Sequence, residues 1–499
     1  MRALLLNKQM NRVLVAVTLS MGLLACGGSD DQEPPLAYIN QSELGGETSV
    51  SVSGSNGFSE PAANLDFTGQ GEFNIGNVLF EKNWTRVGSA NHVFTGLGGL
   101  FNVDACQSCH INDGRGHAPE ENDANANSLL VRLYRPAKDE NEEAELATGL
   151  VANLADGKYG GQLQDKAQSG IPVEADVVVT YENKIMRFQD GFEVTLRKPT
   201  FSFENLGYGE MGSDTRLSPR VANAMIGLGL LENISESDIL ALADPEDADG
   251  DGISGEANFV MDVIKQELVL GRFGWKAGQP SLRQQSAGAF NGDMGLTTTL
   301  FPNENCTDIQ QECLNEVSAI FPDDVDQAEV QNDELDSVEF YVQHLAVPVR
   351  RNVDNADVME GAQLFSDLGC VDCHNPSFNT QVNTRRTQLS EQVIFPFTDM
   401  LLHDMGEELA DQTLSGAAVG TDEVAEYLAN GREWRTAPLW GIGLTQTVDS
   451  QATFLHDGRA RTLMEAVLWH GGEAQASLQK VLTLNESERN QLIAFLESL

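Results

Sequence analysis

Basic residues are scarce in this chain. Its 499 residues include 31 Lys and Arg against 75 Asp and Glu, which gives a formal net charge of −44 at pH 7. A surface with so few cations repels a phosphate backbone, so the composition excludes nucleic acid as a partner. An acidic surface suits a salty environment or a basic redox partner, and it is equally the ordinary solvated face of an acidic protein.

Long hydrophobic runs are absent beyond the N-terminus, so no later stretch is expected to span a membrane. At the N-terminus, Arg2, Lys8 and Arg12 precede the apolar run VLVAVTLSMGLLA. This run is shorter than a transmembrane helix needs, and the charged residues before it are typical of a secretory signal. The pattern predicts a signal peptide over residues 1–25 and an exported protein.

The signal ends in LLAC, a pattern typical of bacterial lipoproteins, which predicts that Cys26 is acylated after cleavage. No Asp follows Cys26 directly, so we expect a lipid anchor in the outer membrane, facing the periplasm or the cell surface. An ordinary signal peptide with a chance cysteine is the alternative. Residues 26–68 begin with a stretch rich in Gly, Ser, Pro and acidic residues, which predicts a disordered tether.

Cysteine is also scarce, with seven in the chain, and four of these lie in two Cys-x-x-Cys-His motifs. With Cys26 assigned to the lipid, only Cys306 and Cys313 remain, in the stretch CTDIQQEC. In an exported protein this spacing predicts a local disulfide. Two free thiols with a redox role are the alternative.

The two Cys-x-x-Cys-His motifs predict covalently bound haem. Two thiols one helical turn apart can add across the vinyl groups of a haem, and the adjacent His then ligates the iron. Zinc would require four ligands at each site, and neither motif has a second cysteine pair. A dithiol oxidoreductase would not need a His at the same place twice. We therefore predict two c-type haems, one held by Cys106, Cys109 and His110 and the other by Cys370, Cys373 and His374.

Helical patterns accompany both motifs. Apolar residues at helical spacing precede the second motif in residues 354–368, and residues 73–84 have a similar Gly and Phe pattern before the first. At the C-terminus, Asn485 and Glu488 form a capping-box pattern ahead of one apolar face. These patterns predict a mainly α fold with two cytochrome c-like haem domains, over residues 69–345 and 346–499.

The first of these domains is expected to carry two insertions. Residues 176–203 are rich in β-branched and aromatic residues around Asp190-Gly191, which predicts a β-hairpin. In the stretch DPEDADGDGISGEANFVMD, Asp247, Asp249 and Asp251 alternate, and Asn258 occupies the twelfth loop position, where an EF-hand has Glu. The stretch predicts a Ca²⁺ site, with a solvated acidic turn as the alternative.

The chain resembles the bacterial di-haem oxidoreductase family, whose members are described as peroxidases and sometimes labelled thiol oxidoreductases. The resemblance covers nearly everything from about residue 70 onward, and the stretches that carry it are GLGGLFNVDACQSCHINDGRG, RLSPRVANAMIGLGLLE, LGRFGWKAGQPSLRQQSAGAFNGDMG, REWRTAPLWGIGLTQT and FLHDGRARTLMEAVLWHGGEA. More distantly, the chain is similar to the di-haem cytochrome c peroxidases and to the di-haem enzyme that matures methylamine dehydrogenase.

This resemblance implies roles around the first haem. Trp275 matches a Trp that lies between the haems, although a core aromatic is the alternative. Gln285 and Asp293 match a Gln and a Glu on the peroxide-binding face, with Asp in place of Glu and a spacing two residues shorter. The region that carries the distal His in peroxidases has none here, so Tyr208 or Met211 ligates that iron or its sixth position is open. We favour the open position.

At the second haem, the resemblance places His470 where the group has its sixth iron ligand, which implies a bis-His iron with His374. A buried structural His is the alternative. Arg459 and Arg461 are expected to pair with haem propionates, and His456 is expected to act in positioning.

The implied function is oxidation by hydrogen peroxide. Peroxide binds at the His110 haem, Asp293 and Gln285 assist the proton transfer, and electrons arrive from the second haem through Trp275. The expected electron donor is external, such as a small cytochrome or a cupredoxin. The alternatives are modification of a protein or polymer driven by O₂ or peroxide, and a non-enzymatic surface lipoprotein that carries electrons or handles iron.

Overall fold

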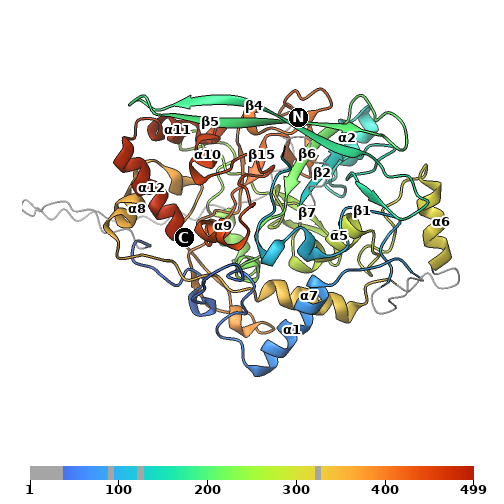
Figure 1. Cartoon of the computed structure of the whole chain (residues 1–499), viewed down its shortest axis with the longest axis horizontal. Helices are drawn as coiled ribbons and strands as arrows, with labels where there is room; N and C mark the ends of the chain where they lie inside the picture. Colours follow the sequence, from blue (N-terminus) through green and yellow to red (C-terminus); the bar gives the residue numbers. More distant parts are fainter. Residues whose placement is uncertain (1–37, 88–94, 121–127, 321–327) are drawn as a thin grey trace, which may run out of the picture. The chain divides into compact units, whose positions relative to one another are not determined.

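Figure 1 shows the computed structural model, which describes residues 38–87, 95–120, 128–320 and 328–499. The predicted signal peptide and Cys26 lie outside the described residues. The helices are α1 (Phe67–Glu81), α2 (Glu140–Ala147), α3 (Leu228–Glu232), α4 (Glu236–Leu240), α5 (Leu282–Met294), α6 (Gln311–Ile320), α7 (Asn332–Gln343), α8 (Ala356–Asp367), α9 (Thr445–Val448), α10 (Leu463–Leu468), α11 (Gln475–Val481) and α12 (Glu486–Ser498). No helix in the described ranges is both long and apolar enough to cross a bilayer.

Most strands are short and pair in small antiparallel sheets. They are β1 (Leu100–Phe101), β2 (Leu129–Tyr134), β3 (Lys166–Ala167), β4 (Asp176–Arg187), β5 (Glu193–Glu204), β6 (Arg216–Val221), β7 (Phe259–Asp262), β8 (Glu267–Leu270), β9 (Phe378–Asn379), β10 (Val393–Ile394), β11 (Leu402–Asp404), β12 (Gln412–Thr413), β13 (Val424–Glu426), β14 (Ala429–Asn430) and β15 (Glu433–Arg435). A three-stranded sheet has the order β12-β6-β2.

The prediction of a mainly α, cytochrome c-like fold is wrong, because the chain is 30% helical and 19% strand. Most of the extra strands are too short to show an alternating pattern, and several have partners that are distant in sequence. Leu217 of β6 pairs with Gln412 of β12, for example. Pro219 also argues against a strand at β6, but it lies beyond the two positions that β12 covers, where no amide proton is needed.

The predicted β-hairpin is confirmed. Strands β4 and β5 pair in unbroken register from Asp176 with Glu204 to Arg187 with Glu193. At the tip, Asp190 accepts a 2.7 Å hydrogen bond from Arg489 of α12, and Figure 1 shows the hairpin running beside α10 and α11. The hairpin therefore ties the middle of the chain to its C-terminal helices.

The helices predicted around the second motif are also confirmed. Helix α8 buries Val358, Ala362 and Phe365 on one face. Helix α12 starts with the expected capping box, in which Asn485 and Glu488 bond reciprocally to the backbone. The two helices pack closely, with the rings of Phe365 and Phe495 5.1 Å apart between centroids.

Residues 38–68 differ from the predicted tether, because they pack against the rest of the protein. Tyr38, Leu44 and Phe58 are buried, and the Tyr38 hydroxyl donates to the Ala362 carbonyl of α8. The few aromatic and aliphatic residues that make this contact are dispersed among polar ones. The average composition of the stretch, on which the prediction rested, therefore does not reveal them. The described residues group into one compact unit.

The crossing of α8 and α12 depends on Gly361, because a Cβ at this position would lie 1.9 Å from the Gln491 carbonyl oxygen. We expect Gly361→Ala to lower the free energy of unfolding by about 1–3 kcal/mol through overpacking. Gly71 of α1 is the matched control, because a Cβ there meets nothing within 4 Å. Thermal unfolding should show Gly71→Ala to be neutral or stabilising, and equal effects of the two variants would contradict this account.

Candidate functional site

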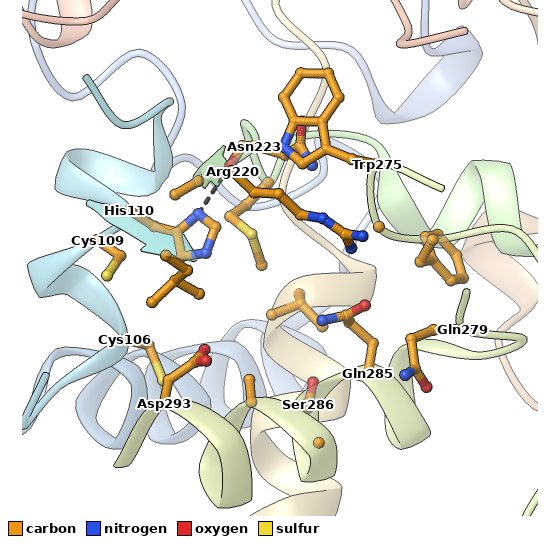
Figure 2. Close-up of a pocket in the computed structure, with 18 of the residues that line it drawn as sticks. Cys106, Cys109, His110, Arg220, Asn223, Trp275, Gln279, Gln285, Ser286 and Asp293 are labelled. Carbon is orange, nitrogen blue, oxygen red and sulfur yellow. Dashed lines mark hydrogen bonds between the residues drawn. The ribbon is translucent and has the colours of Figure 1, made fainter. Parts of the chain in front are cut away.

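A cavity of about 420 Å³ opens next to the first motif. Its wall includes Cys106, Cys109 and His110, and it also includes residues from distant segments, such as Trp275 and Arg435. Figure 2 shows His110, Gln285 and Asp293 around the same space. The structure therefore brings together the first motif and the three residues predicted to carry catalysis.

His110 is held in a defined orientation. Its Nδ1 donates a 2.7 Å hydrogen bond to the Asn223 carbonyl oxygen, drawn as the dashed line in Figure 2. Burial lowers the pKa of His110, so the ring is neutral at ordinary pH. A neutral imidazole whose Nδ1 proton is already committed offers the Nε2 lone pair to a metal.

Helix α5 presents Gln285 and Asp293 to the cavity. The Ser281 side chain caps the helix by accepting from the Gln284 amide. Gln285 is followed after four, seven and eight residues by Ala289, Gly292 and Asp293. At these spacings all four residues lie on one face of the helix. Because Ala289 and Gly292 are small, the two polar side chains border an open space.

Asp293 is a partly buried carboxyl group with a raised pKa, because desolvation outweighs the opposing effects of Arg132 and of a hydrogen bond from Gln162. That bond runs 2.9 Å from Gln162 Nε2 to Asp293 Oδ1. A carboxyl group whose pKa is shifted toward neutrality can both accept and return a proton. Sequence reasoning missed Gln162, which lies 131 residues away from Asp293 and belongs to no motif.

Trp275 forms one wall of the cavity and begins a row of aromatic contacts. Its Nε1 donates to the Val221 carbonyl oxygen at 2.8 Å. The His456 ring lies 6.4 Å from the Trp275 ring between centroids, and it stacks on Trp434 at 3.6 Å. The row therefore extends from the first cavity into the C-terminal part of the chain.

The row continues toward the second motif across a pair of strands. Trp434 of β15 is directly opposite His403 of β11, and directly opposed residues project from the same face of an antiparallel pair. His403 Nδ1 lies 3.7 Å from the sulfur of Cys373. Nothing in the sequence near the motif identified His403 or Trp434.

His403 is a buried cation. Its Nε2 lies 2.7 Å from Asp399 Oδ2 and its Nδ1 lies 2.7 Å from Glu473 Oε2. Burial by itself lowers the pKa of His403, but the hydrogen bonds to these carboxylates raise it well above its usual value. A positive charge is thus fixed beside the second motif.

The second motif faces a second histidine. His374 Nδ1 donates to the Phe397 carbonyl oxygen at 2.9 Å, and His470 Nδ1 donates to the Ala466 carbonyl oxygen at 2.8 Å. The two ring centroids are 6.5 Å apart. Metal–imidazole bonds of about 2.0–2.1 Å place the centroids of two opposed imidazoles roughly 6 Å apart, so the pair has the spacing of two axial ligands.

Neither motif has the character of a reactive dithiol. Burial raises the pKa of Cys106 and of Cys370 to about 12. Redox-active thiols have lowered pKa values, because the thiolate is the nucleophile. Cys306 and Cys313 are joined by a disulfide.

A sequence model of a family described as "Di-haem oxidoreductase, putative peroxidase" matches residues 38–499. The chain belongs to the di-haem oxidoreductase family. Among curated proteins, nothing matches the chain. The resemblance given by the motifs is therefore confirmed at the level of the family.

The residues of this di-haem oxidoreductase fit two haems. At the first site, the charged side chains on the cavity wall are mostly cationic, although the chain as a whole is strongly acidic. Four arginines stand against two carboxylates there: Arg115, Arg132, Arg220 and Arg435 against Asp293 and Glu426. Such an excess of buried positive charge suits the two propionates of a haem.

The arginines predicted to bind propionates at the second site already have carboxylate partners. Arg459 pairs with Asp457 at 2.7 Å and Arg461 pairs with Glu465 at 2.7 Å. The Arg459 side chain is also 1% exposed. Their role toward propionates stays a prediction.

Tyr208 and Met211 were the candidate ligands of the first iron. Tyr208 donates to the Pro172 carbonyl, and both residues belong to the same hydrophobic cluster as Trp275.

The predicted Ca²⁺ loop departs from an EF-hand. It is followed by strand β7, and the buried Asn258 donates to the Lys276 carbonyl and accepts from the Leu428 amide. Asp251 Oδ1 accepts from the Ile253 amide. The carboxylates that lie within 4.8 Å of one another belong to Asp244, Asp247 and Asp249. Asp244 therefore takes the place expected for Asp251.

We expect Ca²⁺ to raise the melting temperature of the protein, because closely placed carboxylates repel one another without a cation. An ion present at 100 times its dissociation constant adds about 2.7 kcal/mol. Asp249→Ala should remove the Ca²⁺ effect, whereas the exposed Asp308→Ala should keep it. Equal melting of the parent protein with Ca²⁺ and with chelator would show that the loop is only an acidic turn.

The predicted ligation of one iron by His374 and His470 implies that His470→Ala converts one haem from low-spin to high-spin, because the variant would remove one of the two imidazoles and leave His374 in place. Electron paramagnetic resonance of the ferric protein measures the change. His117 is a suitable control, because its Nδ1 pairs with Asp449 at 3.7 Å outside both sites. A low-spin spectrum retained in His470→Ala would assign that iron to another ligand.

Proposed function

We propose that the protein is an exported di-haem oxidoreductase that reduces hydrogen peroxide at the first site and receives electrons through the second. Family membership supports oxidoreductase chemistry with haem. The observation that carries the finer proposal is Asp293, a carboxyl group with a raised pKa in the same cavity as His110.

The haems would be held through thioethers by the two Cys-x-x-Cys-His motifs, with His110 and His374 as iron ligands. When bound, the haems supply irons that exchange single electrons, and the first also offers a position for the peroxide. The two sites differ in a way that supports unequal roles. At the second site, His470 faces His374, whereas at the first the cavity is bordered by Asp293, Gln162 and Gln285.

The side chains of the first cavity support the proton transfer that peroxide cleavage requires. Reduction of one hydrogen peroxide to two waters consumes two electrons and two protons. Asp293 accepts the proton of one peroxide oxygen and delivers it to the other, which leaves as water. Gln285 lies on the same face of α5 and is placed to hold the peroxide by a hydrogen bond.

The row formed by Trp275, His456, Trp434 and His403 supports electron transfer between the sites. Both indole N–H groups donate to backbone carbonyls, of Val221 and Leu409. A carbonyl oxygen is too weak a base to remove an indole proton, so electrons can pass without proton loss from either Trp. This contact row suits an external one-electron donor, such as a small cytochrome or a cupredoxin, which acts twice per turnover.

The acidic composition of the chain suits a basic donor of this kind. The lipoprotein-type N-terminus supports a place at the outer membrane, with a lipid on Cys26 as the anchor. O₂ as the oxidant, a protein or polymer as the substrate, and a purely electron-carrying role are the competing functions. Rapid consumption of hydrogen peroxide that depends on Asp293 would distinguish the proposed function from all three.

Asp293→Asn should slow the reaction with hydrogen peroxide by about 10²–10⁴-fold, the usual contribution of a positioned acid–base group. In the parent protein, the rate should fall as the pH drops through the raised pKa of Asp293, because only the carboxylate accepts a proton. The spectra and potentials of both haems should stay nearly unchanged. Stopped-flow absorbance across the pH range measures the rate.

Asp165 provides the matched control. It is also a partly buried carboxyl group with a raised pKa, and it accepts from Asn102, which in turn contacts Gln162. Asp165 is not part of the cavity wall described here, so Asp165→Asn should react at the parental rate. A parental rate in Asp293→Asn would contradict the proton-transfer role.

A further inference from the structure

The backbone around Gln162 fixes this residue on the wall of the first cavity. The segment around it runs along β2, where the Leu133 amide donates to the Gly161 carbonyl and the Leu163 amide donates to the Val131 carbonyl. The Gln162 side chain is 3% exposed and reaches the end of α5. Its placement is therefore set by backbone pairing and does not depend on a flexible loop.

The orientation of the Gln162 amide is determined by its partners. Nε2 lies 3.0 Å from the Gly292 carbonyl oxygen, which can only accept, so the atom facing it must be the nitrogen. Nε2 also lies 2.8 Å from Asn102 Oδ1. Asn102 in turn donates its own Nδ2 to the Leu163 carbonyl, which leaves Oδ1 as the acceptor. Two independent contacts thus assign the nitrogen and the oxygen.

This assignment leaves Gln162 Oε1 as a buried acceptor to which no described residue donates. A buried acceptor without a donor is destabilising, so such groups are rare in native structures. Both Gln162 and Gly292 line the cavity, and a Cβ on Gly292 would lie 3.6 Å from Oε1. Gln162 and Gly292 are thus neighbouring residues of the cavity wall.

Asp293 adds a second acceptor next to the first. Its Oδ1 is held by Gln162 Nε2, while no hydrogen bond to a described residue engages Oδ2. One amide side chain thus holds the carboxyl group through its nitrogen, while its own oxygen has no donor among the described residues. A ligand with two hydroxyl hydrogens matches this arrangement, and a ligand with one does not.

We propose that Gln162 is a specificity-determining residue that selects hydrogen peroxide over alkyl hydroperoxides. This inference rests on the proposed function. Asp293 Oδ2 takes the proton of one peroxide oxygen and returns it to the other, and Gln162 Oε1 accepts a hydrogen bond from the hydroxyl group of that second oxygen. No bond to Gln162 forms or breaks. An alkyl hydroperoxide carries carbon on the second oxygen, so Oε1 stays without a donor and the substrate loses that contact.

The test compares kcat/KM for hydrogen peroxide and for tert-butyl hydroperoxide in the holoprotein. Gln162→Met keeps the side-chain length and removes the amide. Loss of the hydrogen bond from Gln162 Nε2 to Asp293 lowers kcat/KM for both substrates alike. Loss of Oε1 lowers kcat/KM for hydrogen peroxide alone. The ratio of the two kcat/KM values should therefore fall by about 10–100-fold, the effect of one buried hydrogen bond. Gln162→Asn, which withdraws the oxygen by one methylene, should lower the ratio in the same direction.

Gln164→Met is the matched control. Gln164 is also a buried Gln and also donates to the Gly292 carbonyl, at 3.1 Å, but it has no contact with Asp293 and the cavity wall does not include it. The ratio of the two kcat/KM values in Gln164→Met should equal that of the parent protein. If Gln164→Met lowers the ratio as much as Gln162→Met, the effect comes from loosening of Gly292 and the proposal is wrong.

A second readout does not depend on turnover. Difference infrared spectroscopy follows protonation of the Asp293 carboxyl group with pH. Three groups of other elements face this carboxyl group, namely Arg132 of β2 and the sulfurs of Cys106 and Cys109. Because the Gln162 bond lowers the pKa of Asp293, the carboxyl band of Gln162→Met should titrate at a higher pH than that of Gln164→Met.

The outcomes separate this inference from the proposed function. A parental rate in Asp293→Asn would sink the proposed function whatever Gln162 does. A slow Asp293→Asn together with an unchanged substrate ratio in Gln162→Met and Gln162→Asn would overturn only the selectivity of Gln162. Variants that still consume tert-butyl hydroperoxide are folded and loaded with haem, so loss of folding cannot be mistaken for a change of ratio.

Discussion

Two backbone carbonyl groups determine what this protein can bind. The carbonyls of Asn223 and Phe397 accept the Nδ1 protons of His110 and His374, which commits each buried imidazole to one tautomer with Nε2 available. Burial keeps both rings neutral, and it lowers the pKa of His374 to about 4. Both acceptors lie far from the motifs in sequence, 113 residues on for His110 and 23 for His374. Much of the fold therefore has to form before either site has its ligand in place.

The two sites differ in what faces these imidazoles, and this difference organises the proposed chemistry. At the second site, another histidine is held in the same way by the Ala466 carbonyl. At the first, the cavity wall includes Asp293, Gln162 and Gln285, and it has more arginines than carboxylates. A metal with two imidazoles suits electron transfer, whereas a metal beside a buried proton acceptor suits bond cleavage. The row from Trp275 to His403 runs between the two sites within one unit.

Local sequence patterns predicted the parts of the fold that are locally determined. The hairpin around Asp190-Gly191, the apolar face of α8 and the capping box of α12 depend on residues within a few positions of one another. Strand β6 was missed because it pairs with β2 and β12, both distant in sequence, and contains Pro219. Residues 38–68 were misjudged because composition alone does not reveal the few apolar side chains that fill gaps between distant helices.

The same limit applies to the site. Cys106, His110, Asp293 and Trp275 stand in recognisable stretches, so sequence and family resemblance suffice to select them. Gln162 and His403 act through contacts with residues that are distant in sequence, and only folding reveals them. Asn258 shows the reverse error, because its position in a loop pattern suggested a ligand, whereas its side chain is used to bond the backbone of Lys276 and Leu428.

The central claim is that one haem is open to a ligand and the other is closed by His374 and His470. The most direct test is electron paramagnetic resonance of the ferric holoprotein with and without cyanide. The account predicts one high-spin and one low-spin signal, of which only the high-spin signal changes when cyanide is added. Two low-spin signals that cyanide leaves unchanged would contradict it.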